Sequence, residues 1–105
     1  PESYFILANH IDQLPVDQIS IEDAHCCNYS NLLEHFKNST VILGSIAIAK
    51  SQIEKIDDIE NRIRQALEHI DKNRLVIAPD CGLGVLNSNL AVAKLKVMCK
   101  AASRF

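Results

Sequence analysis

The fold follows from an uncharged, apolar stretch in the middle of the chain, Thr40-Val41-Ile42-Leu43-Gly44-Ser45-Ile46-Ala47. A short, continuous apolar run between polar segments is typical of a β-strand that is buried in a parallel sheet. A short β-branched stretch, Gln18–Glu22, predicts another strand, and Arg74–Ala78 predicts a further one. We therefore predict three strands.

Segments with helical periodicity lie before, between and after these runs. Apolar residues recur at helical spacing within 4–14, 28–36, 56–70 and 89–102. Pro15 is expected to end the first helix and Ser30 to cap the second. The order α-β-α-β-α-β-α predicts an α/β fold with a parallel sheet and right-handed crossovers. Because the strands are continuously apolar, we expect both faces of the sheet to be covered.

The length allows one domain, and a small one. The chain has 105 residues, whereas a closed eight-stranded barrel needs about 250. A three-stranded parallel sheet also has two edges with unpaired backbone groups. The chain is thus either an open three-layer sandwich or a piece of a larger fold. Its sheet edges could pair with a second copy of the chain or with the rest of that larger fold. The first residue is Pro1 rather than Met, so we expect further residues before it.

Composition excludes several classes of protein. Hydrophobic residues make up 48% of the chain, and Gly and Pro contribute three residues each, which argues against a disordered segment. The net charge is −2 with no basic block, so we expect neither a nucleic-acid partner nor a membrane surface. The uncharged, apolar run Ser39–Ala49 is shorter than the about 20 residues of a membrane span. Four unevenly placed cysteines and no signal peptide predict a reducing, cytoplasmic location.

Two residues stand at predicted strand ends where ligands bind in parallel α/β folds. Glu22 ends the first strand and Cys81 follows the third. Because the carboxyl ends of parallel strands share one edge of the sheet, these side chains are expected to be neighbours. Zinc accepts both carboxylate oxygen and cysteine sulfur. On spacing alone, a solvated loop acid and a packed turn cysteine remain the simpler interpretations.

Two segments carry a resemblance to a known family. Ile19-Ser20-Ile21-Glu22 and Leu75-Val76-Ile77-Ala78-Pro79-Asp80-Cys81-Gly82-Leu83 resemble the C-terminal catalytic barrel of cobalamin-independent methionine synthase, or of a methyltransferase paralogue. The similarity extends from Ile19 to Ala102. It implies that residues 1–105 are a single partial domain, the C-terminal part of a (β/α)8 TIM barrel.

The resemblance also implies a chemistry. In that family a zinc ion bound by His, Cys, Glu and Cys holds the homocysteine thiol as a thiolate, which attacks a methyl group on a folate nitrogen in methionine biosynthesis. Carried over, Glu22 and Cys81 are metal ligands, and Asp80 orients the cysteine loop. The other two ligands, a His-x-Cys pair, are expected upstream of this chain. The chain alone is therefore expected to be inactive.

One stretch departs from the family and leaves other interpretations open. Residues 47–50 read Ala-Ile-Ala-Lys where true methionine synthases have an Asp-Ile-His run with a proton-donating histidine. The methyl donor is thus undetermined, and a pseudo-enzyme or a non-catalytic binding or assembly module is the alternative. Lys50 either contacts an anionic group or is solvated. His25, Cys26 and Cys27, which follow Glu22, are either further site residues or ordinary loop residues.

Overall fold

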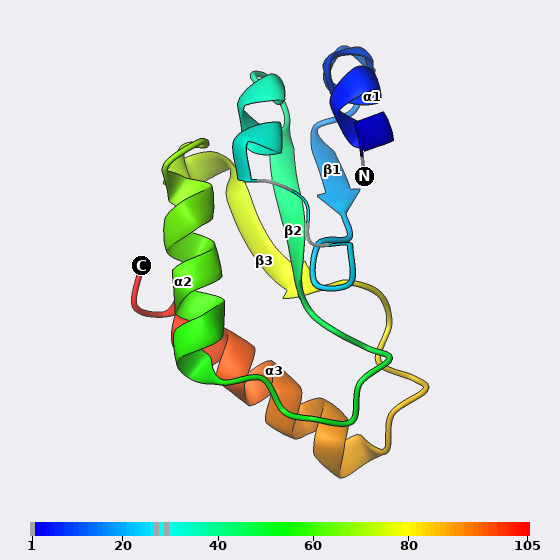
Figure 1. Cartoon of the computed structure of the whole chain (residues 1–105), viewed down its shortest axis with the longest axis vertical. Helices are drawn as coiled ribbons and strands as arrows, with labels where there is room; N and C mark the ends of the chain where they lie inside the picture. Colours follow the sequence, from blue (N-terminus) through cyan, green and yellow to red (C-terminus); the bar gives the residue numbers. More distant parts are fainter. Residues whose placement is uncertain (1, 27, 29) are drawn as a thin grey trace.

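The computed structural model of the chain describes residues 2–26, 28 and 30–105. Figure 1 shows the predicted alternation of helices and strands, which is confirmed. The elements are α1 (Glu2–Asp12), β1 (Gln18–Ile21), the 3-10 helix η1 (Ser30–His35), β2 (Thr40–Ile46), α2 (Ile56–Leu67), the 3-10 helix η2 (Lys72–Arg74), β3 (Leu75–Pro79) and α3 (Ser88–Ala102). Within the described ranges, no helix combines the length and apolar character that crossing a membrane requires.

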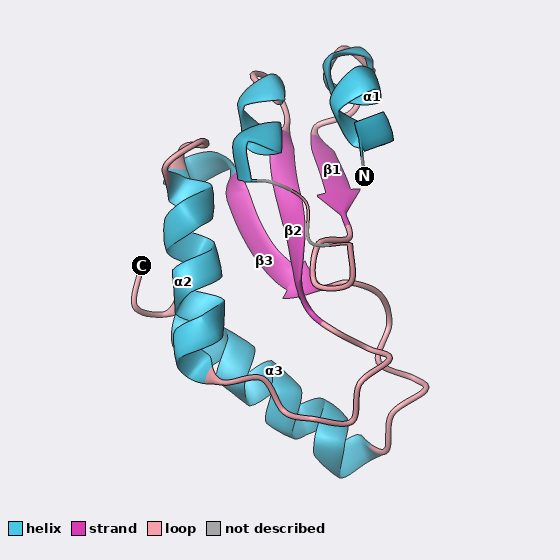
Figure 2. Cartoon of the chain, in the orientation of Figure 1, coloured by secondary structure: helices cyan, strands magenta, loops and turns pink. Residues whose placement is uncertain are grey.

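The three strands form one parallel sheet in the order β1-β2-β3 (Figure 2). The register pairs Ile19 with Val41 and Val41 with Leu75, so these side chains share one face of the sheet. Because all strands run the same way, their carboxyl ends meet at one edge. The candidate residues that follow β1 and β3 are thereby brought to the same end of the molecule.

Helices cover the face that carries Val41 and Leu43. Both side chains are buried in a core that includes residues of α1, η1 and α2, among them Ala8, Leu32, Leu33 and Ala66. A second core lies where α2 and α3 pack together, around Ile59, Ile63, Met98 and Ala101. The apolar stripes of the helices account for both cores.

The opposite face of the sheet is open, so the prediction that both faces are covered is wrong for the described chain. Ser20, Ile42 and Val76 are register partners on this face. Ser20 is exposed and Val76 is 43% exposed. The cores place the described helices on the other side of the sheet. An open three-layer sandwich needs helices on both faces, so that alternative is excluded.

The predicted helix over 28–36 is a 3-10 helix, Ser30–His35, and Ser30 begins it rather than capping it. Both flanks of this segment are anchored by buried carboxylates. The amide of Asn28 donates to Asp23 Oδ1 at 2.8 Å, and the amide of Lys37 donates to Asp12 Oδ2 at 2.9 Å. The few residues left between these anchors form the tighter 3-10 turn, which is used in short pieces. Tyr29 lies outside the described residues.

Gly44 of β2 lies against Asp80, and this close approach predicts a test of the fold. A Cβ at Gly44 would meet Asp80 Oδ1 and would lie 2.9 Å from Asp80 Cα, which is backbone. Gly44→Ala is therefore expected to lower the free energy of unfolding by about 1–3 kcal/mol, as overpacking does. Urea denaturation measures the change. The matched control is Gly84→Ala, because no atom lies within 4 Å of a Cβ at Gly84. Equal losses for the two variants would contradict the packing argument.

Candidate functional site

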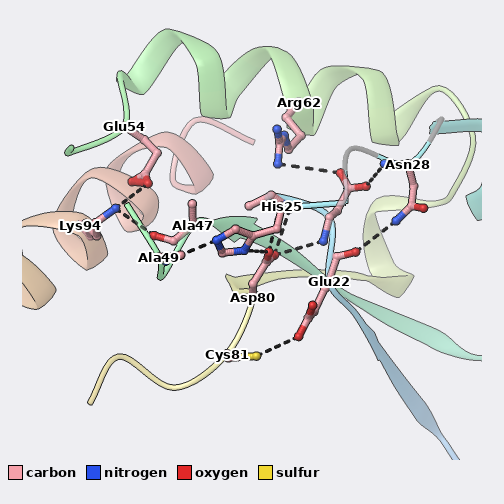
Figure 3. Close-up of polar contacts among 12 residues, drawn as sticks. Glu22, His25, Asn28, Ala47, Ala49, Glu54, Arg62, Asp80, Cys81 and Lys94 are labelled. Atoms are coloured by element: carbon pink, nitrogen blue, oxygen red, sulfur yellow. Dashed lines mark hydrogen bonds and ion pairs between the residues drawn. The ribbon is translucent and has the colours of Figure 1, made fainter. Parts of the chain in front are cut away.

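The ends of β1 and β3 bring a carboxylate and a thiol together. Cys81 Sγ donates a hydrogen bond to Glu22 Oε1 at 2.9 Å (Figure 3). Both residues are exposed. The prediction that these two side chains are neighbours is confirmed, and its cause is the parallel sheet, in which β2 holds β1 and β3 in one direction.

The Glu22 carboxylate favours the protonated form of the Cys81 thiol. The hydrogen bond to Glu22 raises the pKa of Cys81 above its ordinary value, and partial desolvation and the negative charges of Glu22 and Asp80 raise it further. A cation held by the same two groups would reverse this effect, because it stabilises a coordinated thiolate. Glu22 and Cys81 are thus two potential metal ligands that share the thiol proton in a hydrogen bond.

A buried carboxylate holds the two loops of this pair together. Asp80 Oδ1 accepts the backbone amides of Asp23 at 3.1 Å and Ala24 at 3.0 Å, and Oδ2 accepts the amide of His25 at 2.9 Å. The Asp80 side chain has no exposed surface. Since Asp80 directly precedes Cys81, these bonds fix the segment after Glu22 against the start of the cysteine loop.

Asp80 remains ionised in this setting. Burial raises the pKa of Asp80. The backbone hydrogen bonds from Ala24 and Asp23, and then those from the side chain and backbone of His25, lower it by more than burial raises it. The pKa of Asp80 therefore lies below its ordinary value. The cost of burying the charge is offset by hydrogen-bond donors that surround it.

His25 connects all three loops at this edge. Its Nδ1 lies 2.7 Å from Asp80 Oδ2, and its Nε2 accepts the backbone amide of Ala49 at 3.3 Å (Figure 3). A backbone N–H only donates, so Nε2 carries no proton and Nδ1 donates to Asp80. The loop after β1 is therefore bonded to the loop after β2 as well as to Asp80.

Cys26, another residue of the loop after β1, is half-buried. It lies beside Tyr4 of α1, which the sequence indicated only as part of an apolar helix face. Burial raises the pKa of Tyr4, and the Cys26 thiol and the Glu22 carboxylate raise it further. No local pattern in the sequence signals this contact. Cys27 lies outside the described residues.

A buried lysine that sequence reasoning missed shapes the loop after β2. Lys94 of α3 has no exposed surface, and its Nζ donates to Ala47 O at 2.9 Å, Gln52 O at 2.9 Å and Glu54 Oε1 at 2.7 Å. One feature of the sequence indicates this burial: Lys94 falls at helical spacing among the apolar residues Leu90, Val97 and Ala101, on the face of the helix that is expected to be buried.

Lys50 lies in the loop after β2, whose backbone is hydrogen-bonded by Lys94. It lines a polar groove of about 340 Å³ together with Lys55, Asp58 and Arg62. Within the described part of the chain, no hydrogen bond or ion pair is made by its side chain. The structure therefore groups Glu22, Cys81, Asp80 and His25 and leaves Lys50 in a different groove.

The donor set agrees with zinc but is incomplete. A thiol and a carboxylate in contact are ligand types that zinc accepts in four-coordinate sites. Among residues 2–26, 28 and 30–105, no three His, Cys, Asp or Glu side chains come close enough to hold a metal together. A four-coordinate zinc ion at this pair would need two further ligands.

Replacing Asp80 tests its role in the site. Asp80→Asn is expected to lower the free energy of unfolding at pH 7 by about 1.5–3 kcal/mol, because charge-assisted hydrogen bonds are lost. The folded-state pKa of Asp80 lies below the about 3.9 of an unfolded chain. The carboxylate therefore stabilises the fold above about pH 4, and this contribution disappears as the pH falls through the lowered value.

The difference in stability between the unmodified protein and Asp80→Asn should consequently shrink on acidification. Urea titrations of both proteins between pH 7 and pH 3 measure it. A difference that stays constant with pH would contradict the assignment of a stabilising, ionised Asp80.

Comparison with known proteins covers almost the whole chain. The family model described as "Cobalamin-independent synthase, Catalytic domain" matches residues 2–104. The methionine synthase of Pyrococcus horikoshii is 30% identical over 94% of this chain, and that of Thermococcus kodakarensis is 31% identical over 93%. The chain spans about 30% of the length of both relatives.

A solved structure has the same fold. The B12-independent methionine synthase of Shewanella sp. W3-18-1, in complex with selenomethionine, superposes with a TM-score of 0.89 at 25% identity. The match covers 95% of this chain and 29% of that protein. Since the Shewanella protein is a TIM-barrel enzyme, the prediction that the three strands and their helices are part of a (β/α)8 barrel is confirmed.

Proposed function

Because the chain belongs to the cobalamin-independent methionine synthase family, we propose that it forms part of the catalytic barrel of a zinc-dependent S-methyltransferase. The acceptor is a thiol such as homocysteine, and the donor is a methylated folate. Residues 1–105 are a single partial domain, the C-terminal segment of that barrel. The contact of 2.9 Å between Cys81 Sγ and Glu22 Oε1 carries the proposal.

The residues of this chain have different roles at the proposed site. Glu22 and Cys81 contribute two zinc ligands, and the remaining two come from outside these 105 residues. Zinc, when bound, supplies the positive charge that keeps a substrate thiol in its thiolate form at neutral pH. Asp80 holds the segment after Glu22 in place through its three backbone hydrogen bonds. A working thiolate site needs reduced cysteines, which agrees with a cytoplasmic location.

The rest of the barrel is the partner that this chain requires. The open face around Ser20, Ile42 and Val76 corresponds to the side of a barrel strand that points inward. The lining of an apolar groove of about 310 Å³ includes Ile19 and Ile21 of β1, Glu22, and Tyr4, Ile11 and Phe36. Further strands would cover both surfaces and bring the missing ligands, so the isolated chain is inactive.

A non-catalytic role is the second candidate. Residues 47–50, Ala-Ile-Ala-Lys, contain neither an acid nor an imidazole. The described residues supply only two metal donors. A binding or assembly module, or a pseudo-enzyme that keeps the fold, agrees with both observations. Activity that depends on Cys81 separates the two candidates.

The catalytic proposal is tested in the full polypeptide that carries this chain. Cys81→Ser and Glu22→Gln are expected to lower zinc affinity by more than the roughly 10–100-fold that follows the loss of a group that only orients a ligand. Both variants are expected to abolish methyl transfer from methyltetrahydrofolate to homocysteine. Competition with a zinc chelator and a methionine assay measure the two effects.

Cys99→Ser is the matched control, because Cys99 is an exposed thiol on α3. It should change neither quantity. Methyl transfer that survives Cys81→Ser unchanged would remove Cys81 from the mechanism and favour another function for the barrel.

The isolated chain of 105 residues should hold zinc weakly. Two donors leave half of a four-coordinate shell to water, and exposed residues on a single chain add no enclosure. Dialysis against buffer without zinc followed by metal analysis is expected to show far less than one zinc per chain. Stoichiometric zinc bound by one chain through Glu22 and Cys81 would contradict the expected contribution from outside it.

A further inference from the structure

Lys94 of α3 is a buried cation that the proposed zinc site does not use. Its side chain has no exposed surface. A lysine ammonium has three N–H donors, and three oxygens accept them here: Ala47 O at 2.9 Å, Gln52 O at 2.9 Å and Glu54 Oε1 at 2.7 Å. Because each donor has one acceptor, the ammonium is held in a single orientation.

The three acceptors belong to one loop, the segment between β2 and α2. Ala47 is the first residue after β2, and Gln52 and Glu54 lie at the other end of the loop, shortly before α2 begins. The lysine Nζ is thus within 2.9 Å of an oxygen at each end of the loop. All three acceptor residues line the polar groove of about 340 Å³. The contacts of the ammonium therefore shape one side of that groove.

Burying this cation is costly, and filling the space does not require it. An ammonium that leaves water loses its hydration, and a single ion pair seldom repays that loss. A methionine side chain would occupy a similar volume between α3 and the loop without a charge. Apolar contacts are not directional, however, whereas three hydrogen bonds select one path for the loop. The advantage that Lys94 offers is therefore a defined loop conformation rather than stability.

The loop that Lys94 holds lies at the edge of the candidate site. Substrates of TIM barrels bind at the carboxyl ends of the strands, among the loops that follow them. Ala49, in the middle of this loop, donates its amide to His25 Nε2 at 3.3 Å, and His25 Nδ1 lies 2.7 Å from Asp80 Oδ2 (Figure 3). The loops after β1 and β3, which carry the proposed zinc ligands, are joined by Asp80. Lys94 holds the third loop.

We propose that Lys94 is a positioning residue for methyl transfer, an inference that rests on the proposed function. Its ammonium holds the loop after β2 in the conformation that forms one side of the substrate site. Glu54 offsets the buried charge. Because Asp80 holds the zinc ligands without the help of Lys94, loss of the ammonium slows methyl transfer and leaves zinc affinity unchanged.

Two variants of the zinc-loaded full polypeptide separate positioning from stability. Lys94→Met leaves the Glu54 carboxylate without a partner among the described residues, so this variant is expected to be less stable than the unmodified protein. Lys94→Met combined with Glu54→Gln removes both charges and should recover most of the loss, because neutral groups replace a buried ion pair at little cost. Urea denaturation measures the stability of both variants.

Activity should not recover with stability. Both variants are expected to transfer methyl groups about 10–100-fold more slowly, which is the order of effect that a small displacement in a substrate site causes. Their zinc affinity should equal that of the unmodified protein. A methionine assay and competition with a zinc chelator measure the two quantities. If Lys94 only stabilised the fold, activity would return in the double variant.

Hydrogen exchange of the Ala49 amide reports the loop conformation directly. The exchange rate is expected to rise by at least about tenfold in both variants, because hydrogen bonds from a charged donor are lost. Met98→Ala is the matched control, since Met98 is a buried residue of the same helix that packs in the core between α2 and α3. Below its unfolding transition, this variant should be less stable but unchanged in Ala49 exchange and in methyl transfer.

Several results would overturn the positioning role of Lys94 and leave the methyltransferase proposal intact. These are full methyl transfer by the double variant, zinc affinity that falls together with transfer, unchanged Ala49 exchange in Lys94→Met, and a double variant that does not fold. Absence of methyl transfer by the unmodified, zinc-loaded polypeptide would overturn both proposals.

Discussion

The arrangement of this edge depends on one buried carboxylate, that of Asp80. It follows β3, accepts the amides that follow β1, and lies against Gly44 of β2. A buried charge is tolerated only where donors surround it, and here three amides and an imidazole do so. The same bonds that satisfy Asp80 hold the loops after β1 and β3 together at the edge where the parallel strands place Glu22 beside Cys81.

The site has two kinds of side chain: buried ones that fix the loops in place, and exposed ones that are available for chemistry. Asp80 and Lys94 have fully buried side chains and bind mainly backbone atoms of the loops after β1 and β2. Glu22, Cys81 and His25 remain accessible at the surface that these bonds shape. A rigid support with exposed reactive groups is what a metal or thiol site requires, because reactive atoms must be held in position without being blocked.

Apolar runs and strand ends account for how much of this was predictable. The runs around Ile21, Val41 and Ile77 indicated the strands because burial on a sheet leaves a local trace in the sequence. The parallel order then placed Glu22 beside Cys81. The 3-10 form of Ser30–His35 was missed because Asp23 and Asp12 anchor its flanks from outside the segment. Lys94 was missed because its oxygen acceptors come from a loop 40 or more residues away in sequence.

The sequence by itself determined the order of elements, the direction of the strands and the edge at which the thiol meets the carboxylate. The apolar periodicity of each helix and strand is a local property of a few consecutive residues, and the alternation of these elements along the chain indicates parallel strands. Only the tertiary structure decided which face of the sheet stays open, which nitrogen of His25 is basic and what Asp80 binds. The contacts of Asp80, for example, join segments more than 50 residues apart, whose approach no local pattern records.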